Sequence, residues 1–338
     1  MSQSNDPLVN RRFVLAKRPV GAPTRADFSF ETVEATPLSE GGIRVLNRYI
    51  SLDPAMRGWM TALPSYIPPV ELGSVMRAFG VGEVIESRHP NFTVGDHVTG
   101  MVGVQSQVVT SGRGFNGITN TEIPLSAYVG PLGIPGLSAY FGLLDVGQPP
   151  AGQTVLVSGA AGAVGSMVGQ IAKLRGCRVV GIAGGPEKCR HLVEDLGFDG
   201  AIDYKADHIK RAIRERCPDG VDIYFDNVGG DILNAALGWL SVGARVVLCG
   251  AISQYNATTL PAGPSNYLAL LVRRARMEGF IVLDYFDRAP EAMEEIGGWI
   301  AGGQITYRET IVHGLETFPE TFLRLFTGEK LGKLALQV

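Results

Sequence analysis

The chain has 338 residues, 45% of them hydrophobic and 19% charged, which is enough for two domains with well-filled apolar cores. Its formal net charge of −3 argues against nucleic acid or an acidic lipid surface as a partner. No stretch approaches the roughly 18 apolar residues of a membrane span, and the first residues lack the apolar centre of a signal peptide. We therefore expect a frayed N-terminal tail and a cytoplasmic location.

The first third of the chain is predicted to be β-structure. Runs rich in branched residues occur at residues 12–17, 42–52, 81–87 and 96–103, and Gly, Pro, Asn and Asp separate them at short intervals. This pattern is typical of a partly open barrel or sandwich.

From Thr154 onward the pattern changes to an alternation of strands and helices. Strands are predicted at residues 154–159, 177–184, 201–204, 221–229 and 244–250, and helices at 163–176, 186–197, 207–217 and 231–240. Continuous apolar strands separated by helices predict a parallel sheet covered on both faces, which is an α/β fold. Residues 305–314 return to short β-like runs. We expect a nucleotide-binding domain over 131–304 and a second domain built from 1–130 and 305–338.

A glycine-rich turn lies between the first of these strands and the first helix. Gly159, Gly162 and Gly165 have the spacing GxxGxxG, and small residues there let the backbone approach a pyrophosphate at the helix N-terminus. The motif alone is weak, but its strand–turn–helix context favours dinucleotide binding over a purely structural turn.

The end of the next strand indicates which dinucleotide is bound. NAD sites usually carry an acid there for the ribose 2′-hydroxyl, whereas this chain has Gly184 and Gly185, followed by Lys188 in the first helical turn. A cation at a helix N-terminus opposes the helix dipole unless an anion lies beside it. The pattern predicts NADPH, with a solvated surface lysine as the alternative for Lys188.

The distribution of cysteine and histidine argues against a zinc enzyme. The four cysteines are Cys177, Cys189, Cys217 and Cys249, so residues 1–176 contain none, and no CxxC occurs. Catalytic zinc requires Cys, His, Asp or Glu ligands, and a structural zinc lobe requires clustered cysteines. We expect no functional metal and no disulfide framework.

Six segments together resemble one known family. They are SLDPAMRG (51–58), LGIPGLSAYFGLLDVG (132–147), SGAAGAVGS (158–166), DNVGG (226–230), GAISQYN (250–256) and LGK (331–333). In this order they resemble the prostaglandin reductase and alkenal (enone) double-bond reductase branch of the zinc-independent medium-chain dehydrogenase/reductases. The resemblance covers most of the chain. It implies a Rossmann doubly wound parallel sheet inserted in a GroES-like β-barrel catalytic domain, and a homodimer.

The resemblance also assigns residues to sites. Lys188 and Tyr204 resemble the contacts to the NADP 2′-phosphate, and Tyr255 resembles the active-site tyrosine. Arg57 and Tyr255 are expected in the substrate pocket, where Arg57 either steers a carboxylate or braces a loop. The full set of expected cofactor contacts is Pro135, Gly162, Ala163, Val164, Gly165, Gly184, Lys188, Tyr204, Asn227, Cys249, Tyr255, Phe280, Val282 and Lys330.

Two positions depart from the family pattern. Ala55 stands where an aromatic residue is frequent, which widens the expected pocket. Lys330 stands where many members have Asn, so the resemblance leaves open whether the contact on the nicotinamide side is kept.

The expected reaction is delivery of hydride from NADPH to the β-carbon of an enone or enal. Such a reaction needs positioning and a hydrogen-bond donor for the developing oxyanion, and no metal. Tyr255 is the expected donor, with a loop tyrosine covering apolar surface as its alternative. A quinone reductase on the same fold and a non-catalytic dinucleotide-binding protein remain open.

Overall fold

The computed structural model describes residues 9–63, 65–120 and 122–338, and these form two compact units. The first unit contains the described residues up to Val129, together with Thr310–Glu329 and Leu334–Val338. The second contains Gly130–Glu309 and Lys330–Lys333. Most of the tail expected at the N-terminus lies outside the described residues.

The second unit is built on a six-stranded parallel sheet in the order β10-β9-β8-β11-β12-β13. Counted along the chain from β8, this order is 3-2-1-4-5-6, which is the doubly wound Rossmann arrangement, and the predicted fold class is confirmed. Every residue of β8 is buried, as its apolar centre Val155–Val157 requires. The strands are β8 (Thr154–Ser158), β9 (Arg178–Ala183), β10 (Gly200–Asp203), β11 (Val221–Asp226), β12 (Leu240–Leu248) and β13 (Arg276–Gly279).

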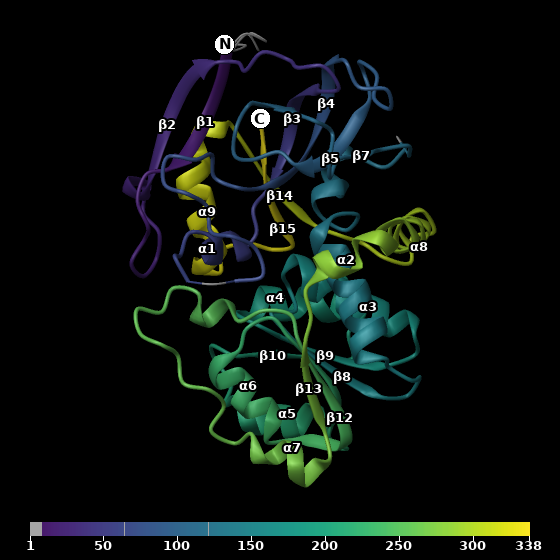
Figure 1. Ribbon diagram of the computed structural model, residues 1–338. Coiled ribbons are helices and arrows are strands. Elements are labelled where there is room, and N and C mark those ends of the chain that lie inside the picture. The colour runs from purple at the N-terminus through teal and green to yellow at the C-terminus, as the bar shows by residue number, and fades with distance from the viewer. Residues whose placement is uncertain (1–8, 64, 121) are drawn as a thin grey trace. The chain divides into compact units, whose positions relative to one another are not determined.

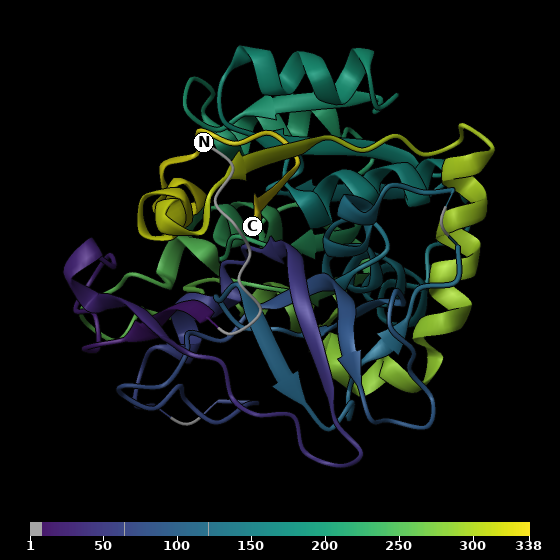
Figure 2. The same ribbon diagram turned by 90° about the horizontal axis from the view of Figure 1, so that it is seen from above.

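Helices cover both faces of this sheet (Figures 1 and 2). On one side α3 packs against α2 and β9, and on the other α5 packs against α6. The helices are α2 (Ile134–Phe141), α3 (Ala163–Leu174), α4 (Pro186–Glu194), α5 (Ile209–Arg216), α6 (Gly230–Leu237), α7 (Leu268–Arg273) and α8 (Ala289–Ala301). Within residues 9–63, 65–120 and 122–338, no helix is both long and apolar enough to cross a lipid bilayer.

The first unit is built on a seven-stranded sheet that combines early and late parts of the chain. Its order is β14-β15-β3-β4-β5-β7, and β6 also pairs with β3. Strand β15 runs antiparallel to β3, with Ala335 opposite Ser51. The strands are β3 (Ile43–Ser51), β4 (Phe79–Ser87), β5 (His97–Met101), β6 (Gln107–Thr110), β7 (Asn116–Gly117), β14 (Glu309–His313) and β15 (Lys333–Gln337).

A hairpin and two helices complete the first unit. Strands β1 (Val9–Leu15) and β2 (Phe28–Glu34) pair antiparallel, and the helices are α1 (Ala55–Trp59) and α9 (Phe318–Thr327). The aromatic rings of α9 pack into the core of this unit, where Phe318 and Phe322 are fully buried.

Two sequence expectations about secondary structure are wrong in detail. The helix expected to run to Leu240 ends at Leu237, because Gly238 caps it, and Leu240 already begins β12. The last residues are not solely β-like, since α9 is a helix. Its apolar residues Phe318, Phe322 and Leu325 follow a helical spacing, and a proline stands in its first turn.

Candidate cofactor and active site

Most of the predicted cofactor contacts follow strands of the parallel sheet at their carboxyl ends. Gly162–Gly165 follow β8, Gly184 and Lys188 follow β9, Tyr204 follows β10, Asn227 follows β11, Cys249 and Tyr255 follow β12, and Phe280 and Val282 follow β13. Because parallel strands end at one edge of their sheet, residues taken from six separate segments share that edge. Ligands of open α/β sheets bind there.

The glycine turn brings α3 close to the end of β8. A Cβ atom on Gly165 would lie 2.5 Å from the carbonyl oxygen of Gly159, so a larger residue would push the helix away from the turn. Gly162 precedes α3 as its N-terminal cap. The first N–H groups of an α-helix have no partner inside the helix, and they therefore form a binding surface for an anion such as a pyrophosphate.

A buried carboxylate organises the loop after β11. Asp226 is 1% exposed and accepts hydrogen bonds from Ser158 Oγ at 2.8 Å, Tyr224 Oη at 2.7 Å and the backbone N–H groups of Val228 and Gly229. Burial and the neighbouring Asp226 carboxylate raise the pKa of Tyr224 well above its usual value, so the phenol stays a donor. Asp226 and Ser158 lie within motifs recognised in the sequence, but only the structure shows that they form one network.

The same network places Asn227. Its backbone N–H donates to Ser158 Oγ, and its side-chain Nδ2 donates to the Ser158 carbonyl, both at 2.8 Å. The loop after β12 is then fixed to the loop after β11, because the N–H of Ile252 donates to the Asn227 carbonyl and the N–H of Ser253 donates to the Val228 carbonyl. The structure therefore joins Asn227 to the segment that carries Tyr255.

Tyr255 closes a short turn at the end of β12. Its phenol oxygen accepts a hydrogen bond from the backbone N–H of Ala251 at 3.1 Å. A phenol can accept one hydrogen bond and donate another. The ring is partly exposed, so the tyrosine is not a residue of the apolar core.

The surroundings of Cys249 favour the protonated form of its thiol. Burial, with a smaller contribution from Asp226, raises the pKa of this thiol to about 12. A protonated thiol is a poor nucleophile. We therefore expect Cys249 to contribute shape to this edge and no covalent chemistry.

Two lysines and a tyrosine gather where β9 and β10 end. Tyr204 and Lys205 lie over Gly184, where an added Cβ would meet the tyrosine ring at 2.8 Å and the lysine Cε at 3.0 Å. Burial lowers the pKa of Lys188, and the charge of Lys205 lowers it further. A cation with a lowered pKa gains most from an adjacent anion. Lys205 was missed by the sequence reasoning, although its position beside Tyr204 was a signal.

The acid two residues before Lys205 is engaged by the backbone. Asp203, the last residue of β10, accepts hydrogen bonds from the N–H groups of Gly185 at 2.8 Å and Lys205 at 3.0 Å. It fixes the turn between β9 and α4. This carboxylate shapes the turn in which the lysines stand.

Three of the predicted cofactor contacts lie away from this set of loops or have other roles. Pro135 is buried at the start of α2. The ring of Phe280 packs edge-on against Phe225 and covers Gly142, so its side chain anchors the loop. Lys330 begins the Lys330–Lys333 segment of the second unit.

Arg57 belongs to the first unit. It is 3% exposed, and its guanidinium donates to the carbonyl oxygens of Pro19 and Gly21. Of its two expected roles, these bonds show the bracing of a loop. A role in the substrate pocket stays a prediction.

In the described part of the chain, no group of three or more His, Cys, Asp or Glu side chains could hold a metal ion. The expectation that the reaction uses no metal stays a prediction.

Comparisons with known proteins agree with this architecture. Residues 11–118 match the family model for the N-terminal domain of oxidoreductases, and residues 163–297 match that for zinc-binding dehydrogenases. The chain is 46% identical to the NADPH-dependent curcumin reductase of Escherichia coli K12 and 39% identical to the NADP⁺-dependent 2-alkenal reductase of Nicotiana tabacum. Each alignment covers 97% of both chains.

A solved structure gives the same result. CurA of Vibrio vulnificus in complex with NADPH superimposes with a TM-score of 0.92 at 44% identity, covering 97% of this chain and 99% of the other. The fold is thus that of a two-unit, nucleotide-binding oxidoreductase. The chain belongs to the enone reductase family of the zinc-independent medium-chain dehydrogenase/reductases.

Proposed function

We propose that this protein is an NADPH-dependent reductase that saturates the carbon–carbon double bond of α,β-unsaturated aldehydes and ketones. The observation that carries the proposal is the carboxyl edge of the parallel sheet. There a glycine turn suited to a pyrophosphate and a lysine pair suited to a 2′-phosphate follow adjacent strands. The E. coli and tobacco relatives, which use this cofactor on curcumin and on 2-alkenals, support it.

The residues present fit this cofactor. The Gly159 carbonyl occupies the place that a Cβ of Gly165 would take, so α3 begins directly against the glycine turn. Strand β9 ends at Ala183 and is followed by Gly184, without an acid at its tip. Gly162–Gly165 would hold the pyrophosphate, and Lys188, Lys205 and Tyr204 would hold the 2′-phosphate. Asn227 and the loop of Tyr255 would border the nicotinamide half.

NADPH held at this edge would supply a hydride to the β-carbon of the substrate. The chain must then stabilise negative charge on the carbonyl oxygen and allow a proton to reach the α-carbon. Tyr255 donates its phenol hydrogen to that oxygen. The Ala251 N–H bond holds the phenol oxygen in place before the reaction, so little reorganisation is needed during it.

A substrate panel tests the reaction class. We expect NADPH absorbance at 340 nm to fall with 2-alkenals and conjugated enones, and the product to be the saturated carbonyl compound with its aldehyde or ketone intact. Mass spectrometry of the product distinguishes this from carbonyl reduction. Turnover of quinones with none of enones would identify a quinone reductase, and no turnover with tight NADPH binding would identify a non-catalytic binding protein.

The same proposal includes a homodimer formed through the second unit. Strand β13 is the last in the order of the parallel sheet. Helix α7, which precedes β13 in the chain and packs against β12, exposes Leu268, Leu271 and Val272 by 59%, 74% and 68%. An exposed apolar surface next to a sheet edge promotes aggregation unless another chain covers it. A second copy, related by a two-fold axis, would pair edge to edge and bury both apolar surfaces.

We expect Leu271→Ala to weaken the dimer about tenfold, because each copy loses apolar contact once at a symmetric interface. Sedimentation velocity over a dilution series measures this. Val94→Ala is the matched control, since Val94 is 66% exposed but belongs to the first unit. A wild-type chain that is monomeric at every concentration would contradict the dimer.

We also place the protein in the cytoplasm. All four cysteines are free thiols, as expected in a reducing compartment.

A further inference from the structure

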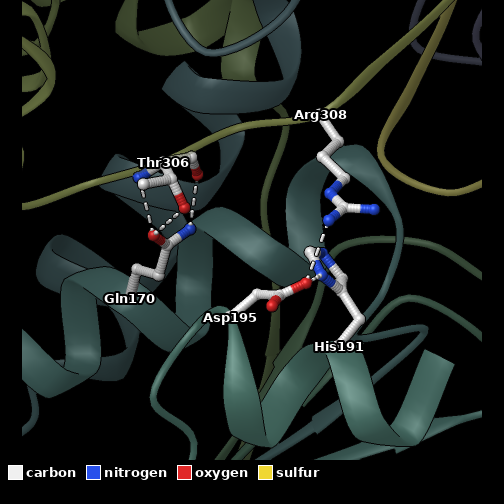
Figure 3. Close-up of polar contacts among 5 residues, drawn as sticks. All are labelled: Gln170, His191, Asp195, Thr306 and Arg308. Carbon is white, nitrogen blue, oxygen red and sulfur yellow. Dashed lines mark hydrogen bonds and ion pairs between the residues drawn. The ribbon is translucent and has the colours of Figure 1, made fainter. Parts of the chain in front are cut away.

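Helices α3 and α4 both begin at the cofactor edge of the parallel sheet. The segment through which the chain leaves the second unit is bound to both of them. We call residues 305–309 the exit segment and Lys330–Lys333 the return segment, because the chain leaves the second unit after Glu309 and re-enters it at Lys330. Ile305 is buried at 2% exposure, which fixes the start of the exit segment after α8. Figure 3 shows the polar contacts that hold the rest.

The first contact joins the exit segment to α3. Gln170 is 5% exposed, and its Nε2 donates to the Thr306 carbonyl at 2.9 Å while its Oε1 accepts from the Thr306 N–H at 2.9 Å (Figure 3). Its Nε2 also donates to the carbonyl of Ser166, one turn earlier in α3. A buried amide with both ends engaged is a rigid connection, because opening it would leave buried polar groups without partners.

The second contact joins the exit segment to α4. Arg308 Nη2 donates to Asp195 Oδ2 at 3.0 Å, and the same oxygen accepts from His191 Nδ1 at 2.6 Å (Figure 3). Asp195 is the residue at the C-terminal cap of α4, and His191 is 7% exposed. The hydrogen bond from His191, with the charge of Arg308 added, lowers the pKa of Asp195, so it is a carboxylate at neutral pH.

The third contact passes through the return segment to the glycine turn. The carbonyl of Arg308 accepts from the Lys333 N–H, and the N–H of Gly332 donates to the Ala161 carbonyl, both at 2.9 Å. Gly332 has φ of +72°, and a Cβ there would lie 2.0 Å from the Arg308 oxygen. Only glycine fits between Arg308 and the turn, which places the return segment directly against the pyrophosphate site.

The three contacts involve elements that bind different parts of the cofactor. The glycine turn and α3 belong to the pyrophosphate site, whereas α4 carries Lys188 for the 2′-phosphate. A cofactor that spans both sites requires the two helices to keep a fixed spacing. Holding that spacing before binding lowers the ordering cost of binding. By linkage, a bound cofactor stabilises the same contacts by an equal free energy.

We propose that Arg308 and Gln170 are positioning residues that clamp the exit segment across α3 and α4, so that cofactor binding and docking of the exit and return segments are coupled. The proposal rests on the proposed function, because it takes NADPH as the ligand. Arg308 then affects binding of the 2′-phosphate from a distance. Its guanidinium binds Asp195 at the C-terminal end of α4, whereas Lys188 lies at the N-terminal end. Gln170 sets the position of the exit segment from which Arg308 reaches that helix.

Cofactor affinity tests the role of Arg308. Its side chain is 56% exposed, so Arg308→Ala should fold. We expect the Kd for NADPH to rise about two- to fivefold, the range of a surface ion pair, with a smaller change for NADH. Arg308→Lys should restore NADPH binding. Lys173→Ala is the matched control, because Lys173 pairs with Asp199 from the far end of α3. Fluorescence titration gives both constants, and thermal unfolding of each variant is followed in parallel.

Two results of the titration would overturn the proposal. If Arg308→Ala lowers the unfolding temperature but leaves the Kd for NADPH at the wild-type value, the clamp is merely structural. If NADPH and NADH weaken equally, α4 is not the element being positioned. If either result is obtained and the wild-type chain binds NADPH, the proposed function is not contradicted. A wild-type chain that does not bind NADPH contradicts the proposed function itself.

Hydrogen exchange tests the coupling directly. At about 100 times the Kd, NADPH should slow exchange of the Thr306, Gly332 and Lys333 amides by tenfold or more, with a limit of roughly 100-fold when opening requires release of the cofactor. In Arg308→Ala at equal saturation, this extra protection should shrink, while that of Val246 in β12 stays as in the wild type. Unchanged exchange of the three amides in wild type with bound NADPH would refute the coupling.

Discussion

Replacing Lys188 by alanine is expected to weaken NADPH binding about 10- to 100-fold and to leave NADH binding nearly unchanged. A charge-assisted bond from lysine to a phosphate contributes about 1.5–3 kcal/mol, and NADH has no 2′-phosphate to lose it. Without the cofactor the charged form of Lys188 is disfavoured, because burial and then the charge of Lys205 lower its pKa. An incoming phosphate removes this penalty, so the discrimination between the cofactors is large.

The measurement is a pair of Kd values, for NADPH and NADH, in the wild type and the variant. Arg190→Ala is the control, since it removes an exposed cation from the same helix outside the first turn. The pH dependence has a definite sign. The lysine is charged below its pKa, so the preference for NADPH should decline as pH rises through a pKa that lies below 10.5. Equal weakening of both cofactors would mean that the substitution damages α4 rather than a phosphate contact.

Replacing Tyr255 by phenylalanine is expected to lower kcat on enones about 10- to 100-fold with almost no change in the Kd for NADPH. Loss of one oxyanion donor costs up to ~3–4 kcal/mol when it is the main donor, and a cofactor ribose hydroxyl is expected to share this role. A donor that acts mainly in the transition state lowers turnover without weakening the ground-state complex.

The hydrogen bond from the Ala251 N–H makes it possible to distinguish loss of the donor from disturbance of the loop. Tyr255→Phe also removes the acceptor of that N–H, so a disturbed loop would appear as weaker NADPH binding. Tyr267→Phe serves as the control, because it removes a phenol from the exposed surface beside α7. Full turnover of Tyr255→Phe on every enone tested would show that the ring is only a wall of the pocket and that another group is the donor.

The sequence predicted features that are encoded locally. Gly165 and Lys188 could be placed because a glycine turn must follow a buried strand, and because the first turn of the next helix has a fixed distance from that strand. The parallel sheet could be predicted because its strands are continuous apolar runs. Edge strand β13 was missed, since its four residues, Arg276–Gly279, carry alternating charge and no apolar run.

The features that could not be predicted depend on contacts between distant segments. Asp226 looks like any acid at a strand end until Tyr224 and Ser158 are seen to donate to it. Arg308 follows no motif, and its bond to Asp195 joins residues 113 positions apart. The bracing role of Arg57 could not be separated from substrate steering, because the carbonyls that it contacts lie in a loop with no distinctive sequence.

The position of β15 has a consequence for how this protein is made. Leu334, Ala335 and Leu336 are fully buried, and their strand completes the edge of β3, which the ribosome produces nearly three hundred residues earlier. At roughly 5–20 residues per second, the newly made β3 waits about a quarter of a minute to a minute for its neighbour. The parallel sheet of Gly130–Glu309 emerges during this interval and can fold first. The antiparallel sheet therefore has an unpaired edge throughout synthesis, and general chaperones that shield such edges should associate with the nascent chain until residues 334–337 have emerged.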